Sequence, residues 1–229
     1  MSRSILIEGQ PAMGKTCSLR SLDPKTTFWL DCDEKGDQWK GFGKEYNKDN
    51  GNYYRTKSSN TILQILKKID EEQKQIKVVV IDTINSVMTG MEFESKKEGY
   101  SKWSDIADFG YNIIQYANKL RDDLVVIMLG HTAVTDEGYE NLITNGRKLE
   151  KIQLTASINA IILAKRKEGR YKFIIRSDNS SARIPMGYFE GVDEIDNDIA
   201  LVFKELEIPY GIRKTNNIEK VKVNKTSEN

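Results

Sequence analysis

The sequence predicts an α/β fold in which a mostly parallel β-sheet carries helices on both faces. Short apolar runs rich in β-branched residues alternate with amphipathic stretches of helical period, as in strands joined by crossover helices. Residues 78–81 are apolar throughout, which is typical of a parallel strand buried on both faces. The apolar segment 5–7 leads directly into a glycine-rich loop at residues 9–16. A chain of 229 residues is long enough for one such domain.

The same patterns place each element along the chain. We expect strands at residues 4–8, 26–30, 53–55, 78–82 and 124–129, and a C-terminal antiparallel hairpin from 158–164 and 171–175. A helix should run from the glycine-rich loop to about Leu22, where Asp23 and Pro24 stop it. Ser58 to Asn60 can cap the next helix, which has the apolar face Ile62, Ile65, Leu66 and Ile69. A later, long helix has the apolar positions Ile106, Phe109, Ile113, Ala117 and Leu120. Asn197 can cap a last helix, whose apolar positions are Ile199, Val202 and Phe203. Irregular segments are expected at 35–52, 89–101 and 132–148.

Composition limits the classes of protein that fit. The formal net charge of +1 gives no overall field that attracts nucleic acid or membrane. We expect one domain at residues 1–212 and a polar tail at 213–229, where five basic and two acidic residues occur and disorder is expected. No apolar run suits a signal peptide or a membrane span, so the expected location is the cytoplasm. Two cysteines and one histidine cannot form a Cys/His zinc cluster, and Cys17 and Cys32 are expected as reduced thiols beside the loop.

The glycine-rich loop matches the full pattern G-x-x-x-x-G-K-[ST]. Its backbone N–H groups can surround phosphate oxygens, Lys15 can reach the β- and γ-phosphates, and the Thr16 hydroxyl can bind Mg²⁺. The positive end of a following helix favours the same anion. An ordinary glycine turn before a helix is the alternative. The pattern therefore predicts binding of a nucleoside triphosphate by Gly9, Gln10, Pro11, Ala12, Met13, Gly14, Lys15, Thr16 and Cys17.

Acidic residues follow two of the predicted strands. Asp82 ends the strand 78–82, where a second Mg²⁺ ligand beside Thr16 belongs; a turn-capping aspartate is the alternative. Because Thr83 and not Glu follows Asp82, the group that activates water must come from elsewhere. Asp33 is our first candidate and Glu34 the second, since both lie beyond the strand 26–30 at the sheet edge that binds ligands. Surface acids of a turn are the competing interpretation.

Two further groups are candidates for contact with the terminal phosphate. His131, the one histidine, and Thr132 end the strand 124–129 at the same edge and can act as γ-phosphate sensors; a local loop hydrogen bond is the alternative for His131. A cationic finger can come from the hairpin residues Lys165, Arg166, Lys167 and Arg170. For that cluster a solvated hairpin tip is the favoured interpretation.

The order of these parts resembles the RecA-like ATPase core. Ile81 to Ser86 looks like the metal-binding strand of that group, and residues 9–28, 120–132, 184–187 and 195–198 resemble small phage-type RecA-like ATPases. These are AAA-family nucleotide-binding proteins, some of which act in single-strand annealing or recombination. The resemblance covers about residues 3–211. It implies that Asp33 takes the place of the catalytic glutamate and His131 that of the γ-phosphate sensor.

The resemblance also implies two DNA-binding loops, at residues 89–102 and 132–148. Their candidate DNA contacts are Lys96, Lys97, Lys102, Arg147 and Lys148. Acidic residues nearly balance these cations, which predicts weak, salt-sensitive binding of single-stranded DNA. Tyr100 and Trp103 can stack on bases, although packing into the core is the favoured interpretation for both.

The leading hypothesis is therefore a Mg²⁺-dependent ATPase in phage-type DNA recombination, annealing or replication, forming a homo-oligomer. Catalysis would rest on Lys15, Asp33, Glu34 and His131. ATP rather than GTP follows from the resemblance and from the lack of an N-K-x-D motif. The alternatives are a non-hydrolysing ATP-binding module that loads a partner protein and a small-molecule kinase, for which the sequence offers no helical arginine-rich lid.

Overall fold

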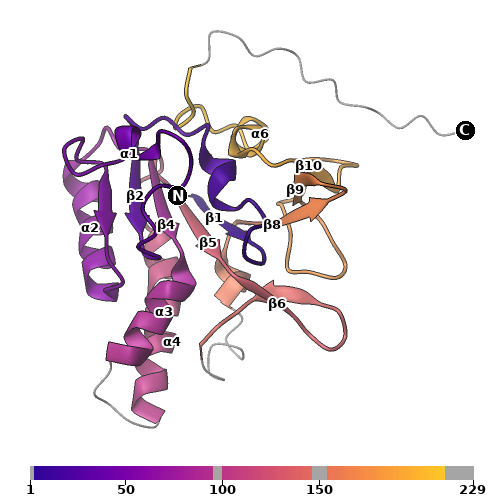
Figure 1. The fold of residues 1–229 in the computed structure, drawn as a ribbon, viewed down its shortest axis with the longest axis horizontal. Helices are drawn as coiled ribbons and strands as arrows, with labels where there is room; N and C mark the ends of the chain where they lie inside the picture. Colours follow the sequence, from indigo (N-terminus) through magenta and orange to yellow (C-terminus); the bar gives the residue numbers. More distant parts are fainter. Residues whose placement is uncertain (1–2, 95–99, 146–153, 215–229) are drawn as a thin grey trace, which may run out of the picture.

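A computed structural model of the chain describes residues 3–94, 100–145 and 154–214. Its core is an eight-stranded sheet with the order β10-β9-β8-β1-β5-β4-β2-β3 (Figure 1). The strands are β1 (Arg3–Glu8), β2 (Thr27–Asp31), β3 (Tyr53–Arg55), β4 (Val78–Asp82), β5 (Val125–Gly130), β8 (Ala160–Lys167), β9 (Arg170–Ile174) and β10 (Glu194–Asp196). Pairing is parallel from β8 to β3, whereas β8–β9 and β9–β10 are antiparallel. The predicted fold class and its C-terminal hairpin are confirmed.

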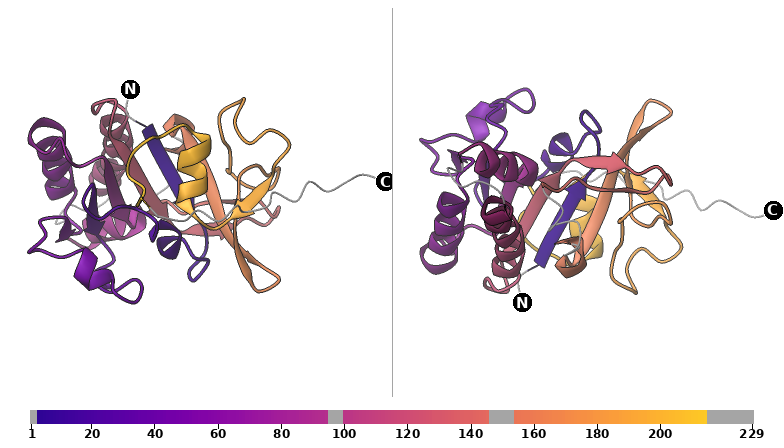
Figure 2. Two further views of the ribbon diagram at one scale, coloured as in Figure 1. Left: turned by 90° about the horizontal axis from the view of Figure 1, so that it is seen from above. Right: turned by 90° about the horizontal axis from the view of Figure 1, so that it is seen from below.

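Alternation along the strands buries both faces of the sheet. Leu6, Val79 and Met128 contribute to one core cluster, whereas Ile5 and Val80 belong to the other. The first face is covered by α2 (Ser59–Glu72), α3 (Ile84–Glu94) and α4 (Tyr100–Ala117). The second is covered by the short turn η1 (Thr16–Leu19), α1 (Phe42–Glu45) and α6 (Ile199–Glu205), and Figure 2 shows α6 lying across the sheet. This two-sided burial explains why the central strands are almost wholly apolar.

The prediction of a helix from the glycine-rich loop to about Leu22 is wrong. The chain makes only the single 3-10 turn η1. The Ser18 hydroxyl donates to the Lys15 carbonyl at 2.5 Å and so competes with a regular helical hydrogen bond. Leu22 then pairs with Ile212 in an isolated bridge, which draws the chain away from a helical path.

The segment 89–101, expected as a loop, is largely helical. Helix α3 continues to Glu94 because Val87 and Met88 are buried and Met91 packs against the same core. Residues 95–99 lie outside the described part of the chain. The second expected loop, 132–148, also contains regular structure: β6 (Thr132–Val134) and β7 (Glu140–Leu142) form an antiparallel hairpin.

Capping residues were predicted correctly in one helix and wrongly in another. Ser58 caps α2, and its hydroxyl accepts the Thr61 N–H, as expected. The cap of α6 is Asp198, which accepts the Ala200 N–H at 3.0 Å, and not Asn197. Asn197 instead lies against the glycine-rich loop, where its side-chain oxygen approaches Gly14. Within the described ranges, no helix has the length and apolar character needed to cross a membrane.

Candidate nucleotide-binding site

The glycine-rich loop follows β1, and its first residue, Gly9, lies between the end of β5 and β8. Gly9 donates its N–H to the Gly130 carbonyl at 3.2 Å. A Cβ atom built on Gly9, whose φ is +152°, would lie 2.5 Å from the Ala164 carbonyl oxygen. Because that oxygen belongs to the backbone of a central strand, it cannot move aside. Glycine is therefore required at this position to keep the loop within the sheet edge.

Lys15 lies folded against the loop. Its Nζ donates to the Gly9 carbonyl at 2.6 Å and to the Gln10 carbonyl at 2.9 Å, and it lies 3.3 Å from His131 Nδ1. Burial lowers the pKa of Lys15 to about 8. Burial and the neighbouring Lys15 charge also lower the pKa of His131. A lysine ammonium only donates, so Nδ1 must be the acceptor and the neutral imidazole carries its proton on Nε2.

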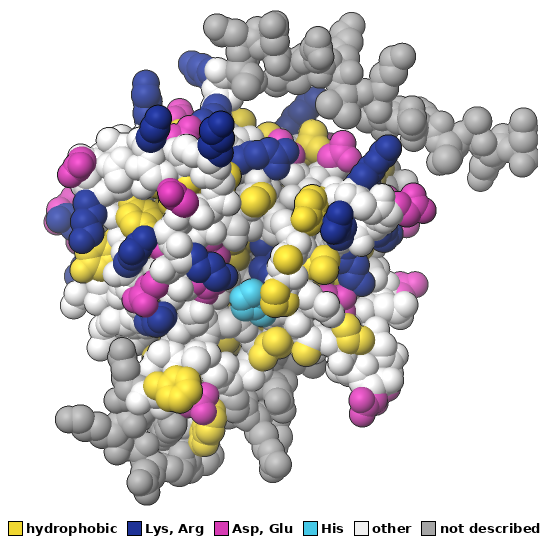
Figure 3. All heavy atoms as spheres, in the orientation of Figure 1, with side chains coloured by type: hydrophobic (Ala, Val, Ile, Leu, Met, Phe, Trp, Pro, Cys, Tyr) yellow, Lys and Arg dark blue, Asp and Glu magenta, His cyan; other side chains and the backbone are white. Residues whose placement is uncertain are grey.

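His131 thus contacts Lys15 of the glycine-rich loop, as expected for a residue just after β5. Figure 3 shows the one histidine side chain at the surface, between basic side chains and a group of hydrophobic ones. Its backbone N–H donates to Asn85 Oδ1 at 2.7 Å, and Asn85 Nδ2 donates to the Ile143 carbonyl at 2.8 Å. Asn85 therefore connects the start of α3, the end of β5 and the chain just after the β6–β7 hairpin. Sequence reasoning missed Asn85, although it lies in the Asp82–Ser86 stretch that resembles the family motif.

Asp82 and Thr16 lie together beside the loop. The Asp82 side chain is buried, and its Oδ2 has no hydrogen-bond partner among the described residues. Burial raises its pKa to about 7, while the Thr16 hydroxyl acts in the opposite direction. A buried carboxylate oxygen without a partner, next to a hydroxyl, fits the oxygen ligands that Mg²⁺ takes from a protein when phosphates supply the others. No cluster of three His, Cys, Asp or Glu side chains suited to a metal occurs in the part of the chain described.

Asp33 is surrounded by donors. Thr83 donates to its Oδ1 at 2.8 Å, Ser86 donates to the same oxygen, and the Lys35 ammonium lies 2.5 Å from Oδ2. Burial alone would raise the pKa of Asp33, but the hydrogen bonds from Lys35, Ser86 and Thr83 lower it to about 2. Asp33 is thus a buried, fixed anion rather than an exposed turn residue. Such a carboxylate can orient a water molecule but is a weak proton acceptor at neutral pH.

The other acids after β2 take different positions. Asp31 is fully buried and accepts hydrogen bonds from the Tyr53 hydroxyl at 2.5 Å and the Gly36 N–H at 3.1 Å, so it holds the following turn. Glu34 is exposed and pairs with Lys57 at 3.0 Å. Lys35, which sequence reasoning missed, interacts with the charges of Asp33 and Asp82. Its signal in the sequence is its place directly after the acidic run.

The basic hairpin residues lie mostly in local contacts. Lys165 pairs with Glu140 at 2.9 Å and Lys167 with Glu194 at 2.6 Å. The Arg166 guanidinium lies over the Tyr171 ring, 5.6 Å from its centroid. These contacts favour a hairpin held to its neighbours over a cationic finger aimed at phosphate. Of the cysteines, Cys17 is exposed, Cys32 is buried, and both are free thiols.

Most of the candidate DNA contacts fall outside the part of the chain that the structure places. Lys96, Lys97, Arg147 and Lys148 lie outside the described residues, and Lys102 is described only as part of helix α4. Trp103 packs against the core cluster, in agreement with the favoured interpretation for it. Tyr100 begins α4.

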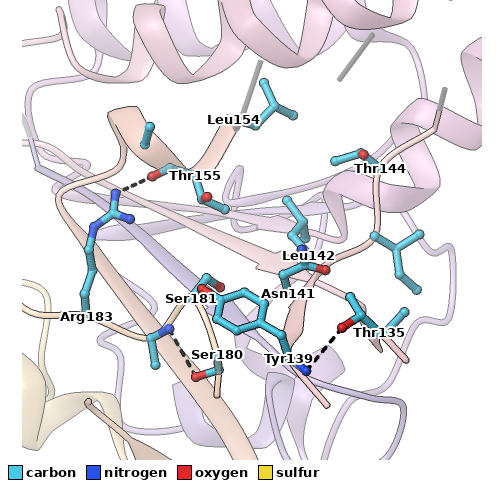
Figure 4. A pocket seen from close by; sticks show the side chains of 14 residues that line it. Thr135, Tyr139, Asn141, Leu142, Thr144, Leu154, Thr155, Ser180, Ser181 and Arg183 are labelled. Carbon is cyan, nitrogen blue, oxygen red and sulfur yellow. Dashed lines mark hydrogen bonds between the residues drawn. The ribbon is translucent and has the colours of Figure 1, made fainter. Parts of the chain in front are cut away.

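A separate cavity of about 660 Å³ opens beside the β6–β7 hairpin (Figure 4). Tyr139 and Asn141 contribute from the hairpin, Thr155 from the turn η2 (Leu154–Ser157), and Ser181 and Arg183 from the chain beyond β9. Arg183 donates to the Thr155 carbonyl and so joins two of the walls. The segment 146–153, which joins two of these walls along the chain, lies outside the described residues.

The mostly parallel sheet, the G-x-x-x-x-G-K-[ST] loop after β1 and Asp82 at the end of β4 define a P-loop α/β core. The chain belongs to the AAA domain family, whose model matches residues 1–161. A comparison with curated proteins found no match. Among solved structures, the chain is similar to a KaiC-like protein from the hyperthermophilic archaeon Pyrococcus horikoshii OT3. The identity is 12%, the TM-score is 0.48, and the match covers 80% of this chain and 82% of that chain.

Proposed function

We propose that this protein binds ATP with Mg²⁺ and hydrolyses it. One observation carries the proposal: Lys15 lies 3.3 Å from His131 at the loop, and Asp82 and Thr16 interact beside it. The parallel strands β1, β2, β4 and β5 end at this edge of the sheet, which brings a cation, a neutral imidazole and two carboxylates to the same place. The choice of ATP over another nucleotide is an inference from the resemblance to ATPases.

Each residue has a distinct role in this proposal. Lys15 and the loop N–H groups bind the phosphates, and Thr16 and Asp82 hold Mg²⁺, which would neutralise charge that develops on the phosphates. His131 donates from Nε2 to the terminal phosphate, while its Nδ1 accepts from Lys15. Asp33, fixed by Thr83 and Ser86, orients the attacking water rather than removing its proton.

We further propose that the bound nucleotide controls weak binding of single-stranded DNA in phage-type recombination, annealing or replication, with the chain acting as a homo-oligomer. The support is the resemblance together with the Asn85 connection between His131 and Ile143. A change at the terminal phosphate that moves His131 would, through Asn85, also move Ile143, which follows the β6–β7 hairpin. Acidic residues on the β6–β7 hairpin, such as Glu140, repel DNA phosphates, so we expect the DNA affinity to be low and salt-sensitive.

The test is ATP turnover with and without single-stranded DNA at low salt, in the wild type, Lys15→Ala and Asp33→Asn. We expect DNA-stimulated turnover that both substitutions remove, with ATP binding lost only in Lys15→Ala. Turnover that is indifferent to DNA would contradict the recombination role but keep the ATPase. Lack of ATP binding by the wild type would contradict the whole proposal.

A second function is favoured by one observation: Lys35, Ser86 and Thr83 already occupy the oxygens of the Asp33 carboxylate and hold it ionised. A carboxylate that holds its charge so strongly removes a proton poorly, which suits a module that binds ATP and loads a partner without turnover. ATP binding with no hydrolysis under any DNA condition would select this function.

A further inference from the structure

We propose that Tyr171 and Asn197 form the site for the purine base of the bound nucleotide. The proposal rests on the proposed nucleotide binding and assigns its opposite end. It concerns side chains on β9 and just before α6, which the phosphate chemistry does not use.

The strand order determines on which side of the loop the nucleoside leaves. Strands β5, β4 and β2 lie to one side of β1 and bring His131, Asp82 and Asp33 to the site. The terminal phosphate belongs on that side, because the Mg²⁺ ligands and the water-orienting group are there. Strands β8 and β9 lie on the other side of β1. Because the triphosphate is a linear chain, its nucleoside end extends towards β8 and β9.

Two side chains on that second side contact the loop directly. A Cβ atom built on Gly14 would lie 2.9 Å from Tyr171 Cδ1 and 3.1 Å from Asn197 Oδ1. Tyr171 comes from the β8–β9 hairpin and Asn197 from a segment more than twenty residues later, so the fold brings them together at Gly14, the last glycine of the loop. Tyr171 stays 45% exposed even with the Arg166 guanidinium over its ring. An exposed aromatic ring at the edge of a nucleotide site offers a stacking surface for a base.

Asn197 supplies a polar group that needs a partner. The residue is only 7% exposed, and its Nδ2 has no hydrogen-bond partner in the described part of the chain. Buried N–H donors are rarely left unpaired, because removing them from water is unfavourable. Capping of α6 does not explain the residue, since Asp198 does that. A side-chain amide has the donor and acceptor pair that matches the edge of a purine, most directly adenine.

The competing explanation is that Tyr171 and Asn197 only support the conformation of Gly14. Binding of two probes separates the two explanations. ATP carries a base, whereas inorganic tripolyphosphate presents the same phosphates without one. Both are titrated by calorimetry, with Mg²⁺, into the wild type, Tyr171→Leu, Tyr171→Phe and Asn197→Ala. Tyr54→Leu is the matched control, since Tyr54 is a similarly exposed tyrosine, 43%, on the far edge strand β3.

We expect Tyr171→Leu to weaken ATP about tenfold or more and to change tripolyphosphate affinity less than about twofold. Tyr171→Phe should bind ATP like the wild type, and Asn197→Ala should lose affinity for ATP alone. Equal losses for both probes, or a wild type that binds ATP no more tightly than tripolyphosphate, would overturn the base site and leave phosphate binding intact. A wild type that binds neither probe would overturn the proposed function as well. Thermal melts confirm that each variant is folded.

Discussion

The Lys35 ammonium lies 2.5 Å from the Asp33 carboxylate, just beyond the end of β2. The pairing helps to hold the pKa of Asp33 at about 2 in spite of burial. Beyond the effect of burial, the Lys35 charge also contributes to lowering the pKa of Lys15. One exposed side chain, Lys35, therefore influences the pKa values of both Asp33 and Lys15.

Lys35→Ala should raise the pKa of Asp33, because the carboxylate loses one donor and a neighbouring positive charge. An NMR titration of the Asp33 carboxyl should show this pKa higher by about one unit. Lys35→Arg keeps the charge and should leave the pKa of Asp33 in place. Identical titrations in all three proteins would show that Lys35 does not control Asp33.

Asp82→Asn should stabilise the metal-free protein at about pH 8 and remove its stabilisation by Mg²⁺ with ATP. The Asp82 pKa is raised to about 7, so above that pH the buried carboxylate is charged while its Oδ2 has no hydrogen-bond partner among the described residues. Melting temperatures with Mg²⁺ or with EDTA measure both effects. Asp33→Asn is the control with the opposite sign, because the Asp33 pKa is lowered and its anion stabilises the fold. Persistent Mg²⁺ stabilisation in Asp82→Asn would argue against Asp82 as a ligand.

Glu8→Gln should make the free energy of unfolding depend less on pH. Burial and the charge of Glu140 raise the Glu8 pKa from 4.5 to about 7, against the Ser181 hydroxyl and Arg183. The folded state then binds more protons than the unfolded state in this interval, so stability falls as pH rises from 4.5 to about 7. Asp82 contributes a fall of the same sign, and urea unfolding is therefore compared in the Asp82→Asn background. Equal pH slopes with and without the Glu8→Gln substitution would contradict this assignment.

Asn85→Ala should separate nucleotide binding from its consequences at the hairpin. Losing the two hydrogen bonds to His131 and Ile143 should lower stability by roughly 1–3 kcal/mol. ATP affinity should change little, because Lys15 and Asp82 keep their positions, whereas turnover and its response to single-stranded DNA should fall. Asn85→Asp keeps the acceptor for the His131 N–H but loses the donor to Ile143. If the DNA response survives in both variants, Asn85 does not transmit the nucleotide state.

Local patterns in the sequence were sufficient for the sheet and the loop. The apolar runs around Val80 and Ile127 and the glycine spacing from Gly9 to Gly14 each express a constraint that acts within a few residues. Prediction failed where distant contacts overrode the local pattern. Leu22 pairs with Ile212 in an isolated bridge, where the local pattern predicted a helix. Helix α3 extends through Met91, where a loop was predicted, because the core cluster buries its apolar face.

The sequence by itself determined a loop of the phosphate-binding pattern that follows a strand and a carboxylate, Asp82, at the end of another. Only the tertiary structure decided that Asn85 joins His131 to the chain after the β6–β7 hairpin, and that Tyr171 and Asn197 meet at Gly14. The loop is visible in sequence because its geometry depends on consecutive backbone torsions. The other contacts join segments up to about 180 residues apart, and polar side chains carry no local signal of which distant partner the folded sheet will bring within hydrogen-bonding range.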